Sequence, residues 1–288
     1  MSFRFFAFAV MVLLGACRRG ADEIADAGSV DGGATDGSEW QGLPGVRFAP
    51  LFPAANARST SFVTSDECAF CHAAGTTALR DTKGRDVSPH ALWRGGMMAL
   101  SARDPYYLAV LEHELAAHPD AQATVMATCT RCHAPAANVE LSAKGTQLTY
   151  AELTQGASVE AKVGRDGVTC SLCHQIRADT LGTKASFTGG YKIGADRRIF
   201  GPHAAPLTTP MVNRLGYTPT ESGHMLDGGL CGSCHTVITR ALDPKSGAAS
   251  GPEVLEQGPY VEWSVSDFAK PGGRTCQSCH MPTVDEEG

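Results

Sequence analysis

The sequence of 288 residues predicts a mainly α-helical fold with extensive loops, in which bound groups fill much of the core. Three observations predict it. Capping signals mark several short helices, and strong alternation of apolar and polar residues, the sign of a half-buried strand, is missing. Glycine (32) and proline (16) are plentiful while aromatic residues make up only 7%, so few large side chains can pack a core. Ten of the eleven cysteines form five pairs of identical spacing.

Each cysteine pair belongs to a Cys-x-x-Cys-His motif. In chain order, motifs 1 to 5 hold Cys68/Cys71, Cys129/Cys132, Cys170/Cys173, Cys231/Cys234 and Cys276/Cys279, followed by His72, His133, His174, His235 and His280. Cysteines at this spacing can form thioethers with the two vinyl groups on one porphyrin edge, and the adjacent imidazole then binds the iron. The sequence therefore predicts five covalently bound c-type haems and a multihaem cytochrome c fold with a haem-filled core.

Three other interpretations of the cysteines compete with haem attachment. Disulfides occur in exported proteins, but a disulfide scaffold does not require a histidine after each pair. Zinc ribbons use two Cys-x-x-Cys units per metal, which an odd number of units does not satisfy. Thioredoxin-like redox pairs occur singly. Because only 10 of 288 residues are histidine, chance placement after all five pairs has a probability below about 10⁻⁷, which favours haem.

The N-terminus carries the features of an export signal. Arg4 precedes an apolar run over 5–14, too short for the roughly 20 residues of a membrane span, and small residues lead to Cys17. This stretch resembles the lipobox of bacterial lipoproteins, so we predict that Cys17 is acylated. Arg18, where an Asp would favour inner-membrane retention, favours the outer membrane. The expected location is a membrane-anchored lipoprotein on the periplasmic face or surface of the outer membrane of a Gram-negative bacterium.

We divide the chain into three parts. Residues 1–16 are a lipoprotein signal peptide, residues 17–45 are the lipidated cysteine and a flexible acidic tether rich in Gly, Asp and Ala, and residues 46–288 are a pentahaem cytochrome c domain. The motifs start at irregular intervals, so the domain is not a repeat of fixed period.

Four helices are expected in the domain. Asp104 and Pro105 predict a helix that ends near His118, and the Thr149-x-x-Glu152 capping box predicts another running towards Val163. Further helices are expected over 88–100 and 259–268. The stretches 178–202 and 240–255 are expected to be loops, with a β-hairpin near 187–199.

Five histidines lie outside the motifs, which equals the number of haems. Four are predicted to bind iron as distal ligands: His90, His224, His203 and His118. His90 lies near a helix start with Trp93 on the same face, His224 and His203 lie in Gly- or Pro-bearing loops, and His118 shares a helix face with Leu111. His113 falls on the opposite face and is expected to be a solvated surface residue.

Methionine is the other residue type that could bind iron here. Met97 and Met98 stand in an apolar helix, where packing against a haem is the expected role. Met281 directly follows a motif histidine and cannot reach across that same haem.

Several phrases resemble one protein family. They are Cys68–His72, Ser88-Pro-His-Ala91 with Trp93, Arg103-Asp-Pro105, Asp166-Gly-Val-Thr-Cys170, Glu256–Tyr260 with Trp263, and Cys276–Pro282. Together they resemble the multihaem cytochromes c related to the tetrahaem cytochrome of hydroxylamine oxidation and to the pentahaem nitrite reductases. The resemblance implies haems stacked closely enough for electron tunnelling and a distal ligand at His90. All five motifs end in histidine rather than in the lysine of the nitrite reductases, which counts against nitrite reduction.

The expected function is electron transfer in an extracytoplasmic respiratory chain, with other redox proteins or quinol-linked cytochromes as partners and a lipid anchor to the membrane. The alternative is a catalytic multihaem oxidoreductase that reduces or oxidises a small nitrogen or sulfur compound at one five-coordinate haem. The net charge of −6, without a basic stripe, argues against a nucleic acid partner.

Overall fold

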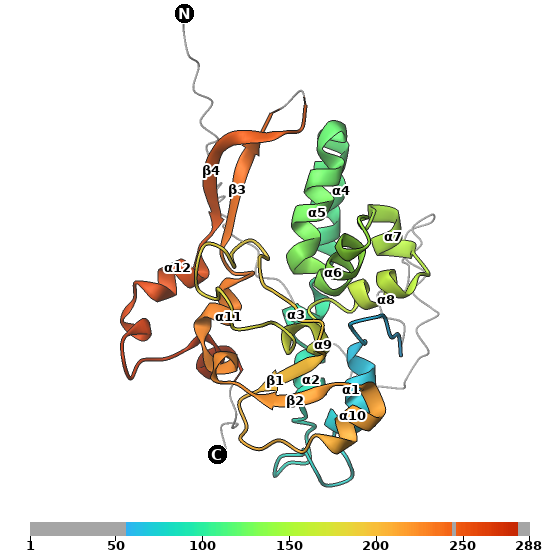
Figure 1. The fold of residues 1–288 in the computed structure, drawn as a ribbon, viewed down its shortest axis with the longest axis vertical. Helices are drawn as coiled ribbons and strands as arrows, with labels where there is room; N and C mark the ends of the chain where they lie inside the picture. Colours follow the sequence, from blue (N-terminus) through green and yellow to red (C-terminus); the bar gives the residue numbers. More distant parts are fainter. Residues whose placement is uncertain (1–55, 244–245, 282–288) are drawn as a thin grey trace, which may run out of the picture. The chain divides into compact units, whose positions relative to one another are not determined.

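A computed structural model describes residues 56–243 and 246–281 (Figure 1). The predicted signal peptide, Cys17 and the acidic tether lie outside the described residues. Within the described ranges, no helix is both long and apolar enough to cross a membrane.

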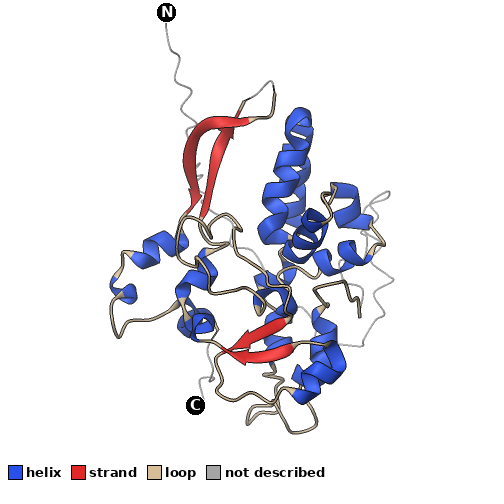
Figure 2. Ribbon diagram, viewed as in Figure 1, coloured by secondary structure: helices blue, strands red, loops and turns tan. Residues whose placement is uncertain are grey.

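The described part is mainly helical with two small sheets, which confirms the expected class (Figure 2). The α-helices are α1 Ser65–His72, α2 Pro89–Arg94, α3 Met97–Leu100, α4 Pro105–Ala117, α5 Gln122–His133, α6 Pro135–Ala143, α7 Tyr150–Gln155, α8 Val159–Arg165, α9 Cys170–Cys173, α10 Thr209–Leu215, α11 Gly228–Gly232, α12 Pro259–Ser264 and α13 Cys276–His280. The 3₁₀ turns are η1 Pro119–Ala121, η2 Gly223–Leu226 and η3 Asp267–Ala269. The strands are β1 Arg198–Gly201, β2 Thr218–Glu221, β3 Val237–Leu242 and β4 Ala249–Gln257.

Helix α4 matches its prediction. The Asp104 side chain accepts a hydrogen bond from the backbone N–H of Tyr107, and Pro105 occupies the first turn, where a missing N–H costs nothing. His118 is the C-cap, and Pro119 begins the short turn η1.

The other three expected helices are each interrupted. The helix expected over 88–100 is divided into α2 and α3, because the chain leaves helical geometry at Gly96. The helix expected from Thr149 is divided into α7 and α8. Thr149 caps α7 as predicted, but Ser158 then starts α8 with a cap of its own. The third helix stops as α12 at Ser264 and is followed by η3.

Both expectations about strands were wrong in part. In place of a hairpin near 187–199, β1 pairs in parallel with β2, the next strand along the chain. The stretch 240–255, expected to be a loop, contributes to an antiparallel hairpin of β3 and β4. Most residues of β4 are exposed, so the strand has no buried face to impose an alternating pattern on its sequence.

Two clusters of buried side chains form the protein part of the core. One lies between α4, α5, α6 and α7 and is centred on Leu111, Leu148 and Leu153. The other surrounds α9, with Phe62 and Leu172 almost fully buried. Because α9 carries motif 3, the second cluster fixes that motif directly to the core.

Candidate haem-binding site

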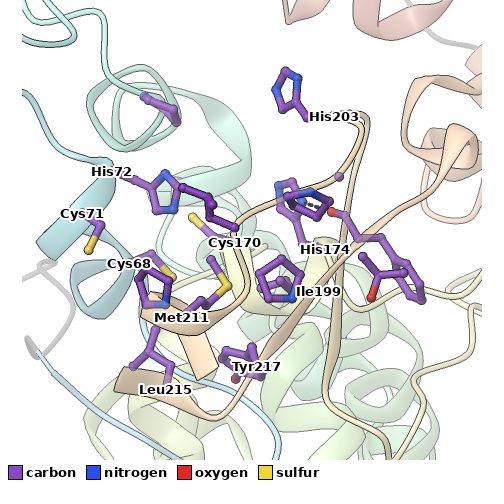
Figure 3. Close-up of a pocket in the computed structure, with 18 of the residues that line it drawn as sticks. Cys68, Cys71, His72, Cys170, His174, Ile199, His203, Met211, Leu215 and Tyr217 are labelled. Carbon is purple, nitrogen blue, oxygen red and sulfur yellow. Dashed lines mark hydrogen bonds between the residues drawn. The ribbon is translucent and has the colours of Figure 1, made fainter. Parts of the chain in front are cut away.

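One cavity of about 480 Å³ is lined by the cysteines and histidines of two different motifs. Cys68, Cys71 and His72 come from motif 1 on α1, and Cys170 and His174 come from motif 3 on α9 (Figure 3). The volume lies within the range of roughly 300–1,000 Å³ that is typical of ligand pockets. The sequence separates these motifs by about a hundred residues, and the fold brings them to one site.

The rest of the cavity wall is largely apolar. It is supplied by β1, α10 and the segment between them: Ile199, Phe200, Pro202, Pro206, Leu207, Pro210, Met211 and Leu215. Ile199, Met211 and Leu215 are labelled in Figure 3. An apolar wall with a few polar groups is the environment that holds a large flat macrocycle such as a porphyrin.

Two of the predicted distal ligands line the same cavity. His90 stands on α2, where its side chain is only 11% exposed and its Nε2 lies 3.3 Å from Oδ1 of Asp66. His203 stands in the loop after β1 and is exposed. The cavity thus contains two motif histidines and two further histidines, which matches the number of axial ligands that two six-coordinate haems require.

The position of α2 depends on a tryptophan. The indole Nε1 of Trp93 donates a 2.9 Å hydrogen bond to the carbonyl of Val168, two residues before motif 3. The bond fixes the helix that carries His90 to the segment that carries the motif.

Two motif histidines are oriented as iron ligands are. Nδ1 of His174 lies 2.6 Å from the carbonyl oxygen of Phe200, and Nδ1 of His133 lies 2.8 Å from that of Ser101. A carbonyl only accepts, so each Nδ1 carries the proton and each Nε2 keeps its lone pair for a metal. Burial also lowers the pKa of both imidazoles, which favours the neutral form that coordinates. Tyr107 stacks on His133 with ring centroids 3.8 Å apart.

Charged groups stand at the edge of the cavity. The nearly buried carboxylate of Glu67 lies 2.5 Å from Arg58 and 3.4 Å from Arg214, and the hydrogen bond from Arg58 holds the pKa of Glu67 below its usual value. Arg214 also covers the Phe70 ring at 3.8 Å. Arg214 is the cation at this wall that could pair with a porphyrin carboxylate.

A buried carboxylate links the segments that lead into motifs 1 and 3. Asp166 is only 1% exposed, and its Oδ2 accepts hydrogen bonds from the backbone N–H and the hydroxyl of Ser65, at 2.8 and 2.7 Å. Burial raises the pKa of Asp166 to about 7 despite these bonds and despite the nearby Arg103. Reasoning from sequence placed Asp166 only in a family phrase and missed this contact, which no local pattern signals.

The five motifs form one connected set. Thiols of different motifs lie close enough to shift one another's pKa in three places: Cys68 and Cys170, Cys132 and Cys234, and Cys231 and Cys276. These pairs join motif 1 to 3, motif 2 to 4, and motif 4 to 5.

Motif 3 also lies next to motif 4. Burial and, to a smaller extent, the neighbouring thiols of Cys231 and Cys234 together raise the pKa of the Cys173 thiol to about 12. Motif 4 therefore has motifs 2, 3 and 5 as neighbours, an arrangement that the spacing along the chain does not reveal.

Cys279 of motif 5 departs from the expectation of a haem-filled core, because it is exposed at the protein surface rather than enclosed. Helix α13 is held through Gln277, which is buried and donates to the carbonyl of Asp227 at 2.8 Å. Residues two apart on a helix point to nearly opposite sides, so burial of Gln277 turns Cys279 outward. Cys71 of motif 1 is also exposed, although it lines the cavity, whereas the other eight motif cysteines are half-buried. Haem attachment at Cys279 stays a prediction, for a haem whose edge faces the surface.

The remaining predicted ligands lie outside the cavity. His224 has both ring nitrogens engaged, Nδ1 at 2.6 Å from the Ser222 hydroxyl and Nε2 at 2.8 Å from the Ile176 carbonyl. The His118 side chain is about half exposed, and its Nε2 lies 3.7 Å from the Glu114 carboxylate. The ring therefore faces the protein surface rather than a buried pocket. His113 is exposed on α4, as expected.

Met97, Met98 and Met281, the methionines weighed as ligands, do not line the cavity of motifs 1 and 3. Met97, Met98 and Met281 are 68%, 38% and 53% exposed. The backbone carbonyl of Met98, rather than its sulfur, makes a defined contact, since it accepts a hydrogen bond from the N–H of Val168.

Comparison of the chain with protein-family models, with curated proteins and with solved structures gave no match.

The residues of the cavity fit covalently bound haem. Paired cysteines stand at its wall, His174 presents a free Nε2, and the lining is apolar. Two further histidines stand within reach of the same space.

Proposed function

We propose that the protein is a lipid-anchored, exported pentahaem c-type cytochrome that relays electrons. Haem iron, when bound, supplies one-electron oxidation and reduction. The observation that carries the proposal is that cysteines of different motifs lie next to one another. A protein that used each haem separately would not need every attachment site to lie beside another.

The chain contributes attachment, orientation and shielding. Its cysteines anchor the porphyrin edge, and the Phe200 and Ser101 carbonyls set the tautomer of two motif histidines. The apolar wall of β1 and α10 would cover one side of a porphyrin held in the cavity shared by motifs 1 and 3. Exclusion of water and the identity of the axial ligands are the two main means by which a protein sets a haem potential.

Haem stoichiometry tests the cofactor part of the proposal. Intact mass and a pyridine haemochrome assay on the purified full-length protein should both give five haems per chain. The Cys276→Ser/Cys279→Ser variant, which lacks the cysteines of motif 5, should give four. Cys17→Ser is the matched control, because Cys17 lies outside every motif and its loss should leave five. A count of three or fewer in the unmodified protein would refute the proposal.

Turnover distinguishes a relay from an enzyme. The reduced protein is mixed with nitrite, hydroxylamine or tetrathionate, and reoxidation is followed at the haem absorption bands. A relay should reoxidise slowly with all three. Rapid, repeated reoxidation that cyanide abolishes would favour the alternative, a multihaem oxidoreductase.

A further inference from the structure

Motifs 4 and 5 repeat the construction of motifs 1 and 3. Helix α2 begins Pro89-His-Ala-Leu-Trp93 and α12 begins Pro259-Tyr-Val-Glu-Trp263. In each, the indole Nε1 donates to the carbonyl two residues before a motif: Trp93 to Val168 at 2.9 Å, and Trp263 to Arg274 at 2.8 Å.

The motif helices follow the same plan. In α9 and α13 the first cysteine opens the helix, and the preceding threonine, Thr169 or Thr275, caps it by accepting from the N–H three residues on. Helix α12 packs on α11 as α2 packs on α1 (Figure 1). The thiol pairs also correspond, because each joins the first cysteines of its two motifs. The unit of motifs 4 and 5 is continuous along the chain, apart from its own connecting loops. In the unit of motifs 1 and 3, the segment with α3 to α8 and motif 2 is inserted between α2 and α9.

The two units differ at the residue that follows the proline. His90 in the first unit corresponds to Tyr260 in the second, and each ring lies against the tryptophan of its own helix. The centroid distances are 6.2 Å for His90–Trp93 and 5.6 Å for Tyr260–Trp263, with interplanar angles of 35° and 29°.

The residues around Tyr260 also differ from those around His90. The two motifs can be aligned on their first cysteines, Cys68 and Cys231. Asp66 and Ala69 of α1 then correspond to Gly229 and Gly232 of α11. A Cβ at Gly232 would lie 2.6 Å from the Tyr260 ring, so only glycine leaves room for it. The carboxylate that faces His90 in the first unit has no counterpart at Gly229. The second unit is therefore built around a tyrosine where the first has a histidine.

We infer that one haem of the pair held by motifs 4 and 5 lacks a histidine ligand opposite its motif histidine and binds a small exogenous ligand of haem iron at that position. The inference rests on the proposed function, since it presupposes haem at these motifs. Apart from the motif histidine His280, α12, α13 and the residues between them carry no imidazole, because 258–279 contain no histidine.

Ligation by Tyr260 itself is the competing arrangement, and the Tyr260→Phe variant described below tests it. The neutral hydroxyl is a hydrogen-bond donor, the group that a bound diatomic molecule or oxyanion can use.

The experiment uses carbon monoxide as the probe and full-length holoprotein with five haems confirmed by mass. The reduced protein should bind one carbon monoxide per chain, and Tyr260→His, which supplies the missing imidazole, should reduce this to none. The high-spin signal of the oxidised protein in electron paramagnetic resonance should disappear with it. Glu262→His is the matched control, because it adds a histidine to the exposed face of the same helix and should leave one site.

The reciprocal variant tests the repeat from the other side. His90→Tyr should raise carbon monoxide binding from one to two per chain, so the inference stays testable even if Tyr260→His does not fold. Five haems with no carbon monoxide site, or a site that Tyr260→His leaves unchanged, would overturn the inference and leave the proposed function intact. The Tyr260→Phe variant tests whether the Tyr260 phenolate itself binds the iron. If a carbon monoxide site appears only in that variant, the inference is also overturned. Fewer than five haems would count against the proposed function instead.

Discussion

The buried carboxylate of Asp166 should make the stability of the folded protein depend on pH. Burial raises its pKa to about 7, against an ordinary value of 3.8. At pH values between 3.8 and 7, Asp166 therefore carries a proton in the folded state but has lost it in the unfolded state. The free energy of unfolding should fall as pH rises through this window and level off above pH 7.

The size of the effect follows from the difference between the two pKa values. At about 1.36 kcal/mol per pH unit, the full loss is about 4 kcal/mol, of which roughly 3 kcal/mol falls between pH 5 and pH 7.5. Asp166→Asn removes the titration and keeps an oxygen that can accept from Ser65. The variant should therefore gain roughly 3 kcal/mol relative to the unmodified protein across the same interval.

Urea unfolding of both proteins, followed by circular dichroism from pH 5 to pH 8, measures the difference. Asp267→Asn is the control, because it removes a carboxylate that is about nine-tenths exposed. The reasoning fails if the free energies of Asp166→Asn and the unmodified protein stay parallel over the whole range. It also fails if the unmodified protein becomes more stable as pH rises from 5 to 7.

Three further predictions concern the anchor, a ligand and the partners. Cys17→Ser should move the protein from the membrane pellet to the soluble extracytoplasmic fraction, and continued pelleting would place the anchor elsewhere. His90→Ala should keep five haems but turn one high-spin, so an unaltered paramagnetic resonance spectrum would exclude His90 as a ligand. Electron exchange with a basic partner protein should slow as salt rises, because the chain carries a net charge of −6. A rate that does not change between low and high salt would contradict electrostatic docking.

Local signals in the sequence were sufficient for some elements of the fold. The Asp104–Pro105 start and the Pro119 stop define α4 because capping chemistry acts within a few residues. Where a glycine interrupts a helical pattern, as at Gly96, the sequence does not show whether the helix continues through the glycine or ends there. The pairing of β1 with β2 was out of reach, since a parallel contact between short segments leaves no periodic trace.

For the candidate site, too, local features could be predicted from the sequence and tertiary contacts could not. Motif chemistry is local, so the sequence identified the cysteines and their histidines, and it selected His90 and His203, which line the shared cavity. The neighbour relations of the motifs and the outward position of Cys279 depend on tertiary packing and could not be predicted. The correspondence of Trp93 with Trp263 was visible in the sequence as a repeated Pro-x-x-x-Trp. It was obscured because motif 2 and six helices stand inside the first copy.

That insertion has a consequence for the order in which the protein matures. The neighbouring cysteines Cys231 and Cys276 are separated by 45 residues, whereas Cys68 and Cys170 are separated by 102. Closing the longer loop costs about 0.7 kcal/mol more in chain entropy, and the closure also waits for α4 to α8 to fold in between. Once all its residues are available, the C-terminal pair should therefore close faster during folding. The N-terminal pair should close more slowly, so the cavity between motifs 1 and 3 should be among the later parts of the fold to form.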